Sequence, residues 1–224
     1  MPTGFACPRK GSPTLAYCSS VFLWSGDLQR AGELIEQLTA FAGRYSLAPY
    51  SAAGIALKGE LAVVRGDAEA GLSLLQCALE TLRAKRHNVF TTLYTGALAE
   101  GLQKTDRVEE ALLTVNGAIA CAIDYGEAIH LAELLRIKAQ VLASAPHHNR
   151  TSSMDCLTES LTVARRQSAL ALELRSATAL ARLLSESGQR DQARRTLALV
   201  YDRFTEGFRT TDLRIARQLI KELA

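Results

Sequence analysis

Apolar residues recur every three to four positions along almost the whole chain, the spacing that gathers them on one face of an α-helix. The stretches 50–145 and 147–224 contain no proline and are rich in leucine, alanine, glutamate, glutamine and arginine, which favour helix. The predicted helices lie at about 13–25, 28–45, 47–65, 68–86, 88–104, 107–124, 127–144, 153–167, 170–186, 190–204 and 212–223. We therefore expect an all-α protein.

Turn residues separate these helices at a nearly constant interval. The turn positions, which lie 40, 40, 40 and 42 residues apart, are Gly26, Gly66, Asp106, Pro146 and Gly188. A fixed period of this length is typical of helical-repeat proteins, in which each repeat is one supersecondary unit. The spacing predicts five antiparallel helix hairpins.

Each repeat carries the same small and aliphatic residues around its turn. Seven positions before the turn stand Ser19, Gly59, Ala99, Ala139 and Ala181. Five positions after it stand Ala31, Gly71, Ala111 and Ala193, and nine positions after it stand Ile35, Leu75, Val115 and Leu197. Matched small residues let two helices approach closely, and the aliphatic side chain fills the groove between them. Glycine at the turn tolerates a positive φ, and aspartate can cap the next helix.

The fourth repeat departs from this pattern because its turn, residues 145–153, is about five residues longer. Its polar composition predicts an exposed loop, and the extra length puts Cys156 in the small position of the next helix. Helix 212–223 is amphipathic and is expected to cap the stack. Together these features predict a right-handed α-solenoid: one repeat domain over 13–224, preceded by a disordered segment at 1–12.

The spacing of small residue, turn glycine, small residue and aliphatic residue resembles the tetratricopeptide repeat, stretched to about 40 residues. A narrower resemblance rests on the stretches Gly59–Asp67, Gly96–Glu100, Glu133–Arg136 and Tyr201–Phe208. They are similar to the C-terminal helical-repeat region of large bacterial ATP-binding transcriptional and signalling regulators. This resemblance covers roughly 14–224 and implies a partner that is an ATPase or DNA-binding domain of the same system. The sequence contains no G-x-x-x-x-G-K-[ST] loop, so the chain is expected to be a fragment, a truncated product or a stand-alone repeat protein.

Composition narrows the functional classes further. Hydrophobic residues make up 48% and charged residues 22% of the 224 residues, which is typical of a globular protein. No apolar run reaches the length of a membrane span, and no membrane contact is expected. The net charge is only +3, with both signs interspersed, so we expect no direct nucleic-acid contact. Five widely spaced cysteines are interpreted as reduced thiols, which indicates a cytoplasmic protein.

Candidate chemical sites are few. His147 and His148 are the only clustered histidines, and their neighbours are poor metal ligands. Cys77 and Cys121 lie on helix faces spaced for packing, with no adjacent histidine. We therefore expect no metal, no cofactor and no enzymatic activity.

A candidate binding groove follows from the repeat. One position after the small residue of each first helix stand Ser20, Glu60, Glu100, Gln140 and Arg182, with Arg136 one turn before Gln140. If the first helices line the concave face, these residues form a ladder that runs from acidic to basic. Trp24, Val63 and Val64 would supply its apolar contacts. The alternative is that these charges form structural salt bridges between repeats.

Two functional hypotheses remain open. The first, which we favour, is a non-catalytic interaction module that binds a peptide or partner domain in this groove. The second is a small-molecule sensor, in which the same groove closes around an inducer. A sensor requires a partly apolar pocket of some hundreds of cubic ångströms, whereas a peptide module requires a long open channel. The identity of the partner and the oligomeric state are left open.

Overall fold

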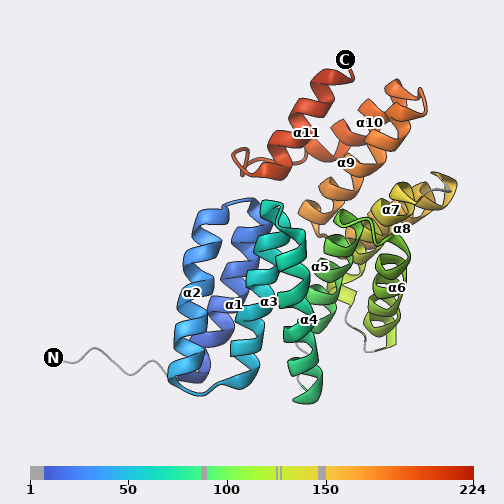
Figure 1. Cartoon of the computed structure of the whole chain (residues 1–224). Helices are drawn as coiled ribbons and strands as arrows, with labels where there is room; N and C mark the ends of the chain where they lie inside the picture. The colour runs from blue at the N-terminus through green and yellow to red at the C-terminus, as the bar shows by residue number, and fades with distance from the viewer. Residues whose placement is uncertain (1–7, 87–89, 125, 127, 146–149) are drawn as a thin grey trace. The chain divides into compact units, whose positions relative to one another are not determined.

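The computed structural model describes residues 8–86, 90–124, 126, 128–145 and 150–224, and the elements in these ranges are helical. They are α1 (Pro8–Ser25), α2 (Leu28–Arg44), α3 (Ala48–Arg65), α4 (Ala68–Ala84), α5 (Thr91–Lys104), α6 (Val108–Asp124), the short 3-10 helix η1 (Ala128–His130), α7 (Leu131–Ser144), α8 (Arg150–Arg166), α9 (Leu170–Glu186), α10 (Arg190–Tyr201) and α11 (Thr211–Glu222) (Figure 1). The all-α prediction is confirmed. None of the helices in these ranges is long and apolar enough to span a membrane.

Most of the turns between consecutive helices contain one residue in the left-handed region. At the predicted turn positions Gly26, Gly66 and Gly188 have φ of 82°, 97° and 77°, and Asp106 adopts 61°. Glycine has no Cβ to clash in this conformation, which explains its place there. Asp27 caps α2 by accepting a hydrogen bond from the backbone N–H of Arg30 at 3.0 Å. The positive φ predicted for the turn glycines is therefore confirmed, whereas the predicted turn position Pro146 lies outside the described residues.

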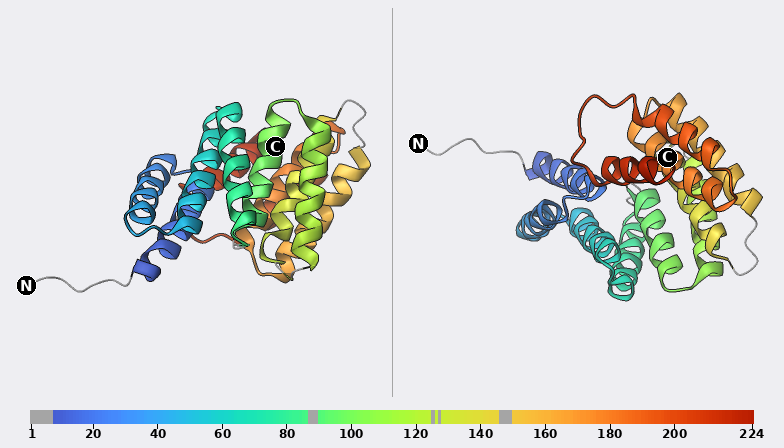
Figure 2. Two further views of the ribbon diagram at one scale, coloured as in Figure 1. Left: turned by 60° about the horizontal axis from the view of Figure 1, so that its bottom comes forward. Right: turned by 90° about the horizontal axis from the view of Figure 1, so that it is seen from above.

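Two compact units can be distinguished along the chain, one up to Thr105 and one from Asp106 onward. In unit 1 each helix packs against the next, and α3 also contacts both α1 and α5. These helices lie side by side in Figure 1, and the right-hand view of Figure 2 looks nearly along them. In unit 2 consecutive helices again pack together, and α9 also contacts both α7 and α11. We call α1, α3 and α5, and likewise α7, α9 and α11, the first-helix rows of the two units.

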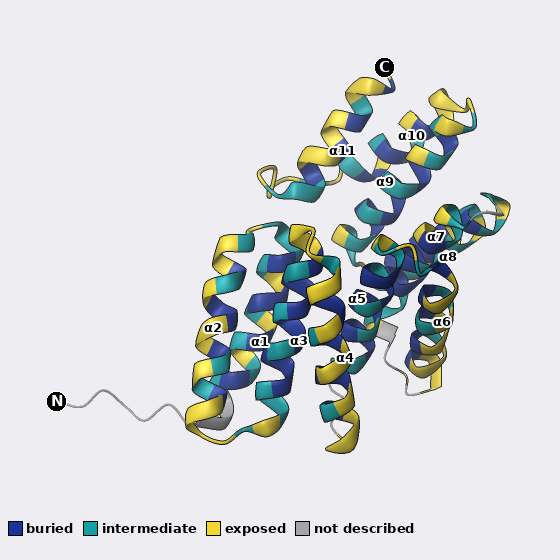
Figure 3. Ribbon diagram, viewed as in Figure 1, coloured by how far each residue is buried: buried dark blue, intermediate teal, exposed yellow. Residues whose placement is uncertain are grey.

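The predicted small and aliphatic positions lie in the core. Ser19, Ala99 and Ala181 have no exposed surface, and the same holds for the aliphatic residues Leu75 and Val115. In Figure 3 buried residues cover much of α3, whereas α2 and α4 carry exposed outer faces. The predicted helix pairs α1–α2, α3–α4, α7–α8 and α9–α10 therefore pack together in the folded chain.

The backbones of α3 and α4 approach each other closely at two glycines. A Cβ added at Gly59 would lie 2.9 Å from the carbonyl oxygen of Gly71, and a Cβ at Gly71 would lie 2.8 Å from the carbonyl oxygen of Gly59. Real Cβ atoms do not tolerate such distances, so glycine is required at both positions. The two small positions of this repeat thus face each other.

In the fourth repeat the small position is one helical turn earlier than predicted. Ser153, fully buried, faces Ala139 and donates a hydrogen bond from Oγ to the Ala139 carbonyl oxygen at 3.0 Å. Cys156, the predicted small residue, is only half-buried. The reason is that α8 begins at Arg150 rather than at 153, so the turn is shorter than its composition suggested.

The N-terminal segment also differs from its prediction. Helix α1 begins at Pro8, so residues 8–12 belong to a helix rather than to a disordered segment, and Pro13 lies inside it. Ser12 is fully buried, and a Cβ at Gly11 would lie 3.3 Å from the Phe41 ring, so this turn packs on α2. Residues 1–7 lie outside the described residues. The single domain predicted over 13–224 stays a prediction.

Candidate binding surface

The first-helix row of unit 1 carries five of the predicted groove residues. They are Trp24 on α1, Glu60, Val63 and Val64 on α3, and Glu100 on α5. Val64 is 44% exposed, while Trp24 and Glu100 are half-buried. These three side chains are therefore accessible to a partner.

Glu60 and Val63 do not have the open positions that the repeat pattern predicted. Val63 is 1% exposed, and its Cγ2 fills the space above Gly71, where a Cβ would lie 2.5 Å away. It is a core residue because the two glycines of this hairpin leave room for it. Glu60 is 8% exposed, so only part of its carboxylate can reach a ligand.

An aromatic group that sequence reasoning missed lies beside Glu60. The rings of Tyr17 and Phe90 meet edge to face at 4.7 Å, and Phe90 lies 6.1 Å from Tyr94. Tyr94 is fully buried, and burial raises the pKa of its phenol, with the negative charge of Glu60 raising it further. Tyr17, 57% exposed, brings this group to the surface. Tyr17 stands three residues before the predicted groove position Ser20 and therefore lies on the same face of the helix, which is how the sequence could have indicated it.

In unit 2 the predicted groove residue Arg136 belongs to a buried ion-pair network. Its Nη2 donates to Glu133 Oε1 at 2.8 Å and its Nε donates to Glu133 Oε2 at 3.0 Å, while Nη1 donates to Gln140. Arg175 on α9 donates from Nη1 to Glu133 Oε1 at 3.1 Å and from Nε to Asp212 Oδ2 on α11 at 2.7 Å. The network joins all three helices of the row. These three hydrogen bonds of Arg136 stay within α7, and Arg175 supplies the link from Glu133 to α9 and α11.

The electrostatics of Glu133 follow from this geometry. Burial alone would raise the pKa of its carboxyl group. The charges of Arg136 and Arg175, together with the hydrogen bonds that they donate, outweigh burial and lower the pKa to about 2. Glu133 is therefore ionised across the physiological range.

A second buried carboxylate has the same arrangement. Glu173 on α9 is 1% exposed, and it accepts hydrogen bonds from Arg165 Nε at 2.8 Å and from Arg203 Nη1 at 2.6 Å. Both arginines keep about half of their side-chain surface exposed. Neither this network nor Arg175 was predicted, because their partners lie far apart in the sequence.

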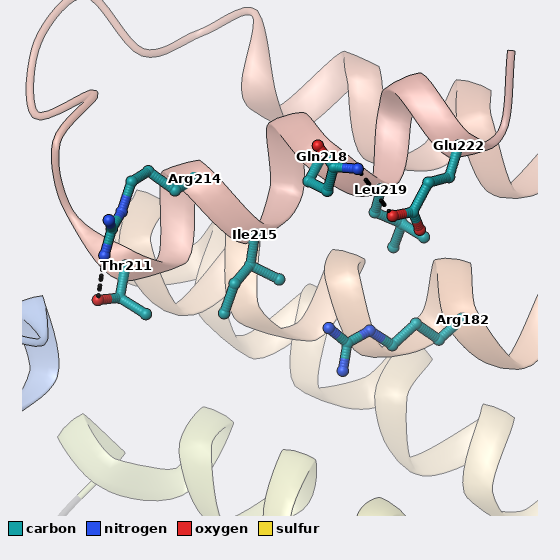
Figure 4. Close-up of a pocket in the computed structure, with 7 residues that line it drawn as sticks. All are labelled: Arg182, Thr211, Arg214, Ile215, Gln218, Leu219 and Glu222. Atoms are coloured by element: carbon teal, nitrogen blue, oxygen red, sulfur yellow. Dashed lines mark hydrogen bonds between the residues drawn. The ribbon is translucent and has the colours of Figure 1, made fainter.

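The remaining predicted residues of unit 2 are exposed. Gln140 lies on the surface of α7, and Arg182 lies on α9 at the edge of a pocket of about 320 Å³. Figure 4 labels the residues that line this pocket: Arg182, Thr211, Arg214, Ile215, Gln218, Leu219 and Glu222. All of them except Arg182 belong to α11, so the pocket lies between two helices of the first-helix row.

The described part of the chain contains no arrangement of side chains typical of a metal site or of a catalytic nucleophile. No three histidine, cysteine, aspartate or glutamate side chains gather there as metal ligands would. Cys77 and Cys121 are free and exposed. His147 and His148, the clustered histidines of the sequence, lie outside the described residues.

Solved structures with a similar fold are helical repeats. One is a Podosopora anserina protein assigned as a kinesin light chain with nearly identical TPR-like repeats, with 18% identity and a TM-score of 0.56 over 88% of this chain and 96% of that chain. A glutamine-to-methionine variant of it matches with 18% identity and a TM-score of 0.57 over 86% of this chain and 94% of that chain. No protein family and no curated protein sequence matches the chain.

These neighbours establish a TPR-like helical-repeat fold, as the spacing of small residues predicted. Stacked helix pairs of this kind present extended surfaces. At 18% identity the likeness shows the fold alone, and the function depends on the surface residues.

Proposed function

We propose that the chain is a non-catalytic interaction scaffold of a bacterial transcriptional or signalling regulator in the cytoplasm. It binds a peptide or a partner domain, such as the ATPase or DNA-binding domain of the same system, along its first-helix rows. The regulator context rests on the sequence resemblance described above. The site rests on the surface chemistry of unit 1.

One observation carries the proposal: large apolar side chains stand exposed on the first helices of unit 1. Tyr17 and Val21, one turn apart on α1, are each 57% exposed, and Val64 on α3 is 44% exposed. Burying one such side chain against a partner contributes on the order of 1 kcal/mol to the free energy of binding. Half-buried Trp24 lies on the same helix as Tyr17 and Val21, and a partner that covered these side chains would remove them from water.

The carboxylates in this row give the surface a polar component. Glu100 on α5 is half-buried, and Glu60 on α3 is mostly buried beside Tyr94. A bound segment would therefore place apolar side chains against Tyr17 and Val64 and donate hydrogen bonds to Glu100. This combination fits a peptide or a helix rather than a small metabolite.

A small-molecule sensor is the second candidate. The pocket between α9 and α11, about 320 Å³, has the size that this function requires and contains apolar as well as charged side chains. Native mass analysis of the purified chain separates the two candidates, because a sensor retains a co-purifying metabolite and a scaffold does not.

The test uses the tagged full chain as bait in lysate, followed by mass spectrometry. The variant Tyr17→Ser with Val64→Ser should lose the captured protein, because it removes exposed apolar surface at two positions that are 57% and 44% exposed. The matched control, Leu199→Ser, changes a 72% exposed residue on the second helix α10. Glu60→Lys is unsuitable as a probe, because it would bury a new positive charge.

Circular dichroism must give the same helix content for both variants. Equal capture by the Tyr17 and Val64 variant and the original chain would refute this surface as the binding site. Equal loss in the Leu199 control would show that capture is non-specific adsorption to apolar surface.

A further inference from the structure

The pocket between α9 and α11 has an apolar floor and a positively charged rim. Ile215, 38% exposed, and Leu219, 9% exposed, form the floor on α11. Arg182 reaches the pocket from α9, and Arg214 reaches it from the first part of α11 (Figure 4). Guanidinium groups next to apolar surface suit a ligand that carries both a carboxylate and an apolar side chain.

The acidic side chains near this pocket are already engaged. Glu222 Oε1 accepts a hydrogen bond from Gln218 Nε2 at 2.9 Å. Glu186, one helical turn after Arg182, faces the guanidinium of Arg150 at 3.6 Å. These carboxylates therefore have other partners.

Asp212, the acidic residue in the first turn of α11, is also engaged. Its Oδ2 accepts from Arg175 Nε at 2.7 Å within the buried network of unit 2. This bond fixes the start of α11 against α9, which holds the two walls of the pocket in place. Asp212 thus contributes to the shape of the pocket, and its charge is compensated by Arg175.

The two rim arginines, by contrast, keep their charge available. Arg182 makes no hydrogen bond or ion pair with any residue that the structure describes, and Arg214 has only a long contact of 3.5 Å to Thr211 Oγ1. Each guanidinium can donate two parallel hydrogen bonds to a carboxylate. The lining holds two arginines and one carboxylate, Glu222, so the net charge of the pocket is positive and is complementary to an acidic ligand.

We propose that this pocket binds an acidic segment of a partner protein, with carboxylates on Arg182 and Arg214 and an apolar side chain on Ile215. The inference deepens the scaffold function proposed above and rests on it. The apolar floor between the two charges favours a protein segment over a nucleic-acid backbone, whose phosphates offer nothing to cover Ile215. Unit 2 would thus select a different segment from the apolar surface of unit 1.

The test measures fluorescence polarisation of a labelled probe peptide with glutamates on both sides of a central leucine, titrated with the full chain. Arg182→Glu with Arg214→Glu should weaken binding about tenfold or more, because charge-assisted hydrogen bonds are lost and repulsion replaces them. The matched control, Arg194→Glu with Arg195→Glu, makes the same change of net charge on the exposed face of α10. It should leave binding unchanged.

Two further probes test the chemistry of the ligand. A peptide with glutamine in place of glutamate should bind about tenfold more weakly, and Ile215→Ser should weaken the acidic peptide while Leu199→Ser does not. If the double reversal reduces helix content, Arg182→Gln replaces it, because it only removes an exposed charge. Arg182→Gln should also bind the acidic peptide more weakly than the original chain, and equal binding would contradict the inference.

Three outcomes would overturn the inference. They are equal loss in the α10 control, equal binding of the glutamine peptide, and stronger pocket-dependent binding of a DNA duplex than of the acidic peptide. The proposed scaffold function fails separately, through lysate capture that does not depend on Tyr17 and Val64. A chain can therefore keep that function while the pocket inference is refuted.

Discussion

Replacing Glu133 by glutamine removes the charge at the centre of the buried network while keeping its shape. The carboxylate accepts three hydrogen bonds from Arg136 and Arg175, at 2.8, 3.0 and 3.1 Å. Glutamine cannot accept all three, and it leaves two guanidinium groups in a buried site with less compensation. Removing one partner of a buried ion pair is strongly destabilising for this reason.

The size of the effect follows from the pKa of Glu133. The carboxyl pKa falls from 4.5 to about 2 on folding, which corresponds to about 3 kcal/mol of stability, since one pKa unit is worth about 1.4 kcal/mol. Because the folded pKa lies below the unfolded one, this stability is fully present above pH 4.5 and is lost as the pH falls toward 2. Glu133→Gln should therefore lower the free energy of unfolding at neutral pH, and the difference should shrink between pH 4.5 and 2.

The assay is urea denaturation followed by far-UV circular dichroism at neutral pH and at several acidic values. The single tryptophan, Trp24, lies in unit 1, so its fluorescence reports a part of the chain that the substitution does not touch. Glu110→Gln is the control, because Glu110 pairs with Arg107 on the surface and should have no measurable effect. A difference below about 1 kcal/mol at neutral pH, or one that does not change with pH, would refute the reasoning.

Two further substitutions test the hairpin packing and the turns. Gly71→Ala should destabilise the chain by about 1–3 kcal/mol in urea denaturation, because its Cβ would lie 2.5 Å from Val63 Cγ2. Gly117→Ala, where nothing lies within 4 Å, should not destabilise, and equal destabilisation in both would refute the close approach. Ser168→Gly should raise the melting temperature, with a gain of about 0.5–1 kcal/mol, because Ser168 has a φ of 54°. A gain from Ser168→Ala as well would exclude this explanation.

The helices and turns were predictable because they depend on local periodicity. Helix α9 has the predicted bounds 170–186, and the turn glycines Gly26, Gly66 and Gly188 all adopt the left-handed conformation. The wrong assignment of Cys156 to the small position of the fourth repeat has a local cause too. Ser153 is as small as Cys156 and lies one turn earlier. Residue size alone could not distinguish the two registers.

The candidate site was less predictable because it depends on how far each helix is rotated against its neighbours. Val63 and Val64 are adjacent in sequence, yet one is buried by a glycine pair and the other is exposed. Arg136 stood at a predicted groove position, but it is buried in a network that also includes Arg175, 39 residues later in the sequence. Arg182 lies at the edge of a pocket whose opposite wall comes from α11, a helix that carried no predicted site residue.

Different interactions stabilise the interior of each unit, and they constrain how the sequence of each unit can change. In unit 1 the contact of Gly59 with Gly71 leaves no room for a single added methyl group. Substitution of either glycine is therefore not tolerated. In unit 2 each buried carboxylate, Glu133 or Glu173, has two arginine partners, so losing one arginine still leaves the other as a counter-charge. Over evolutionary time we expect the glycines of unit 1 to stay fixed while the arginines of unit 2 are exchanged one at a time.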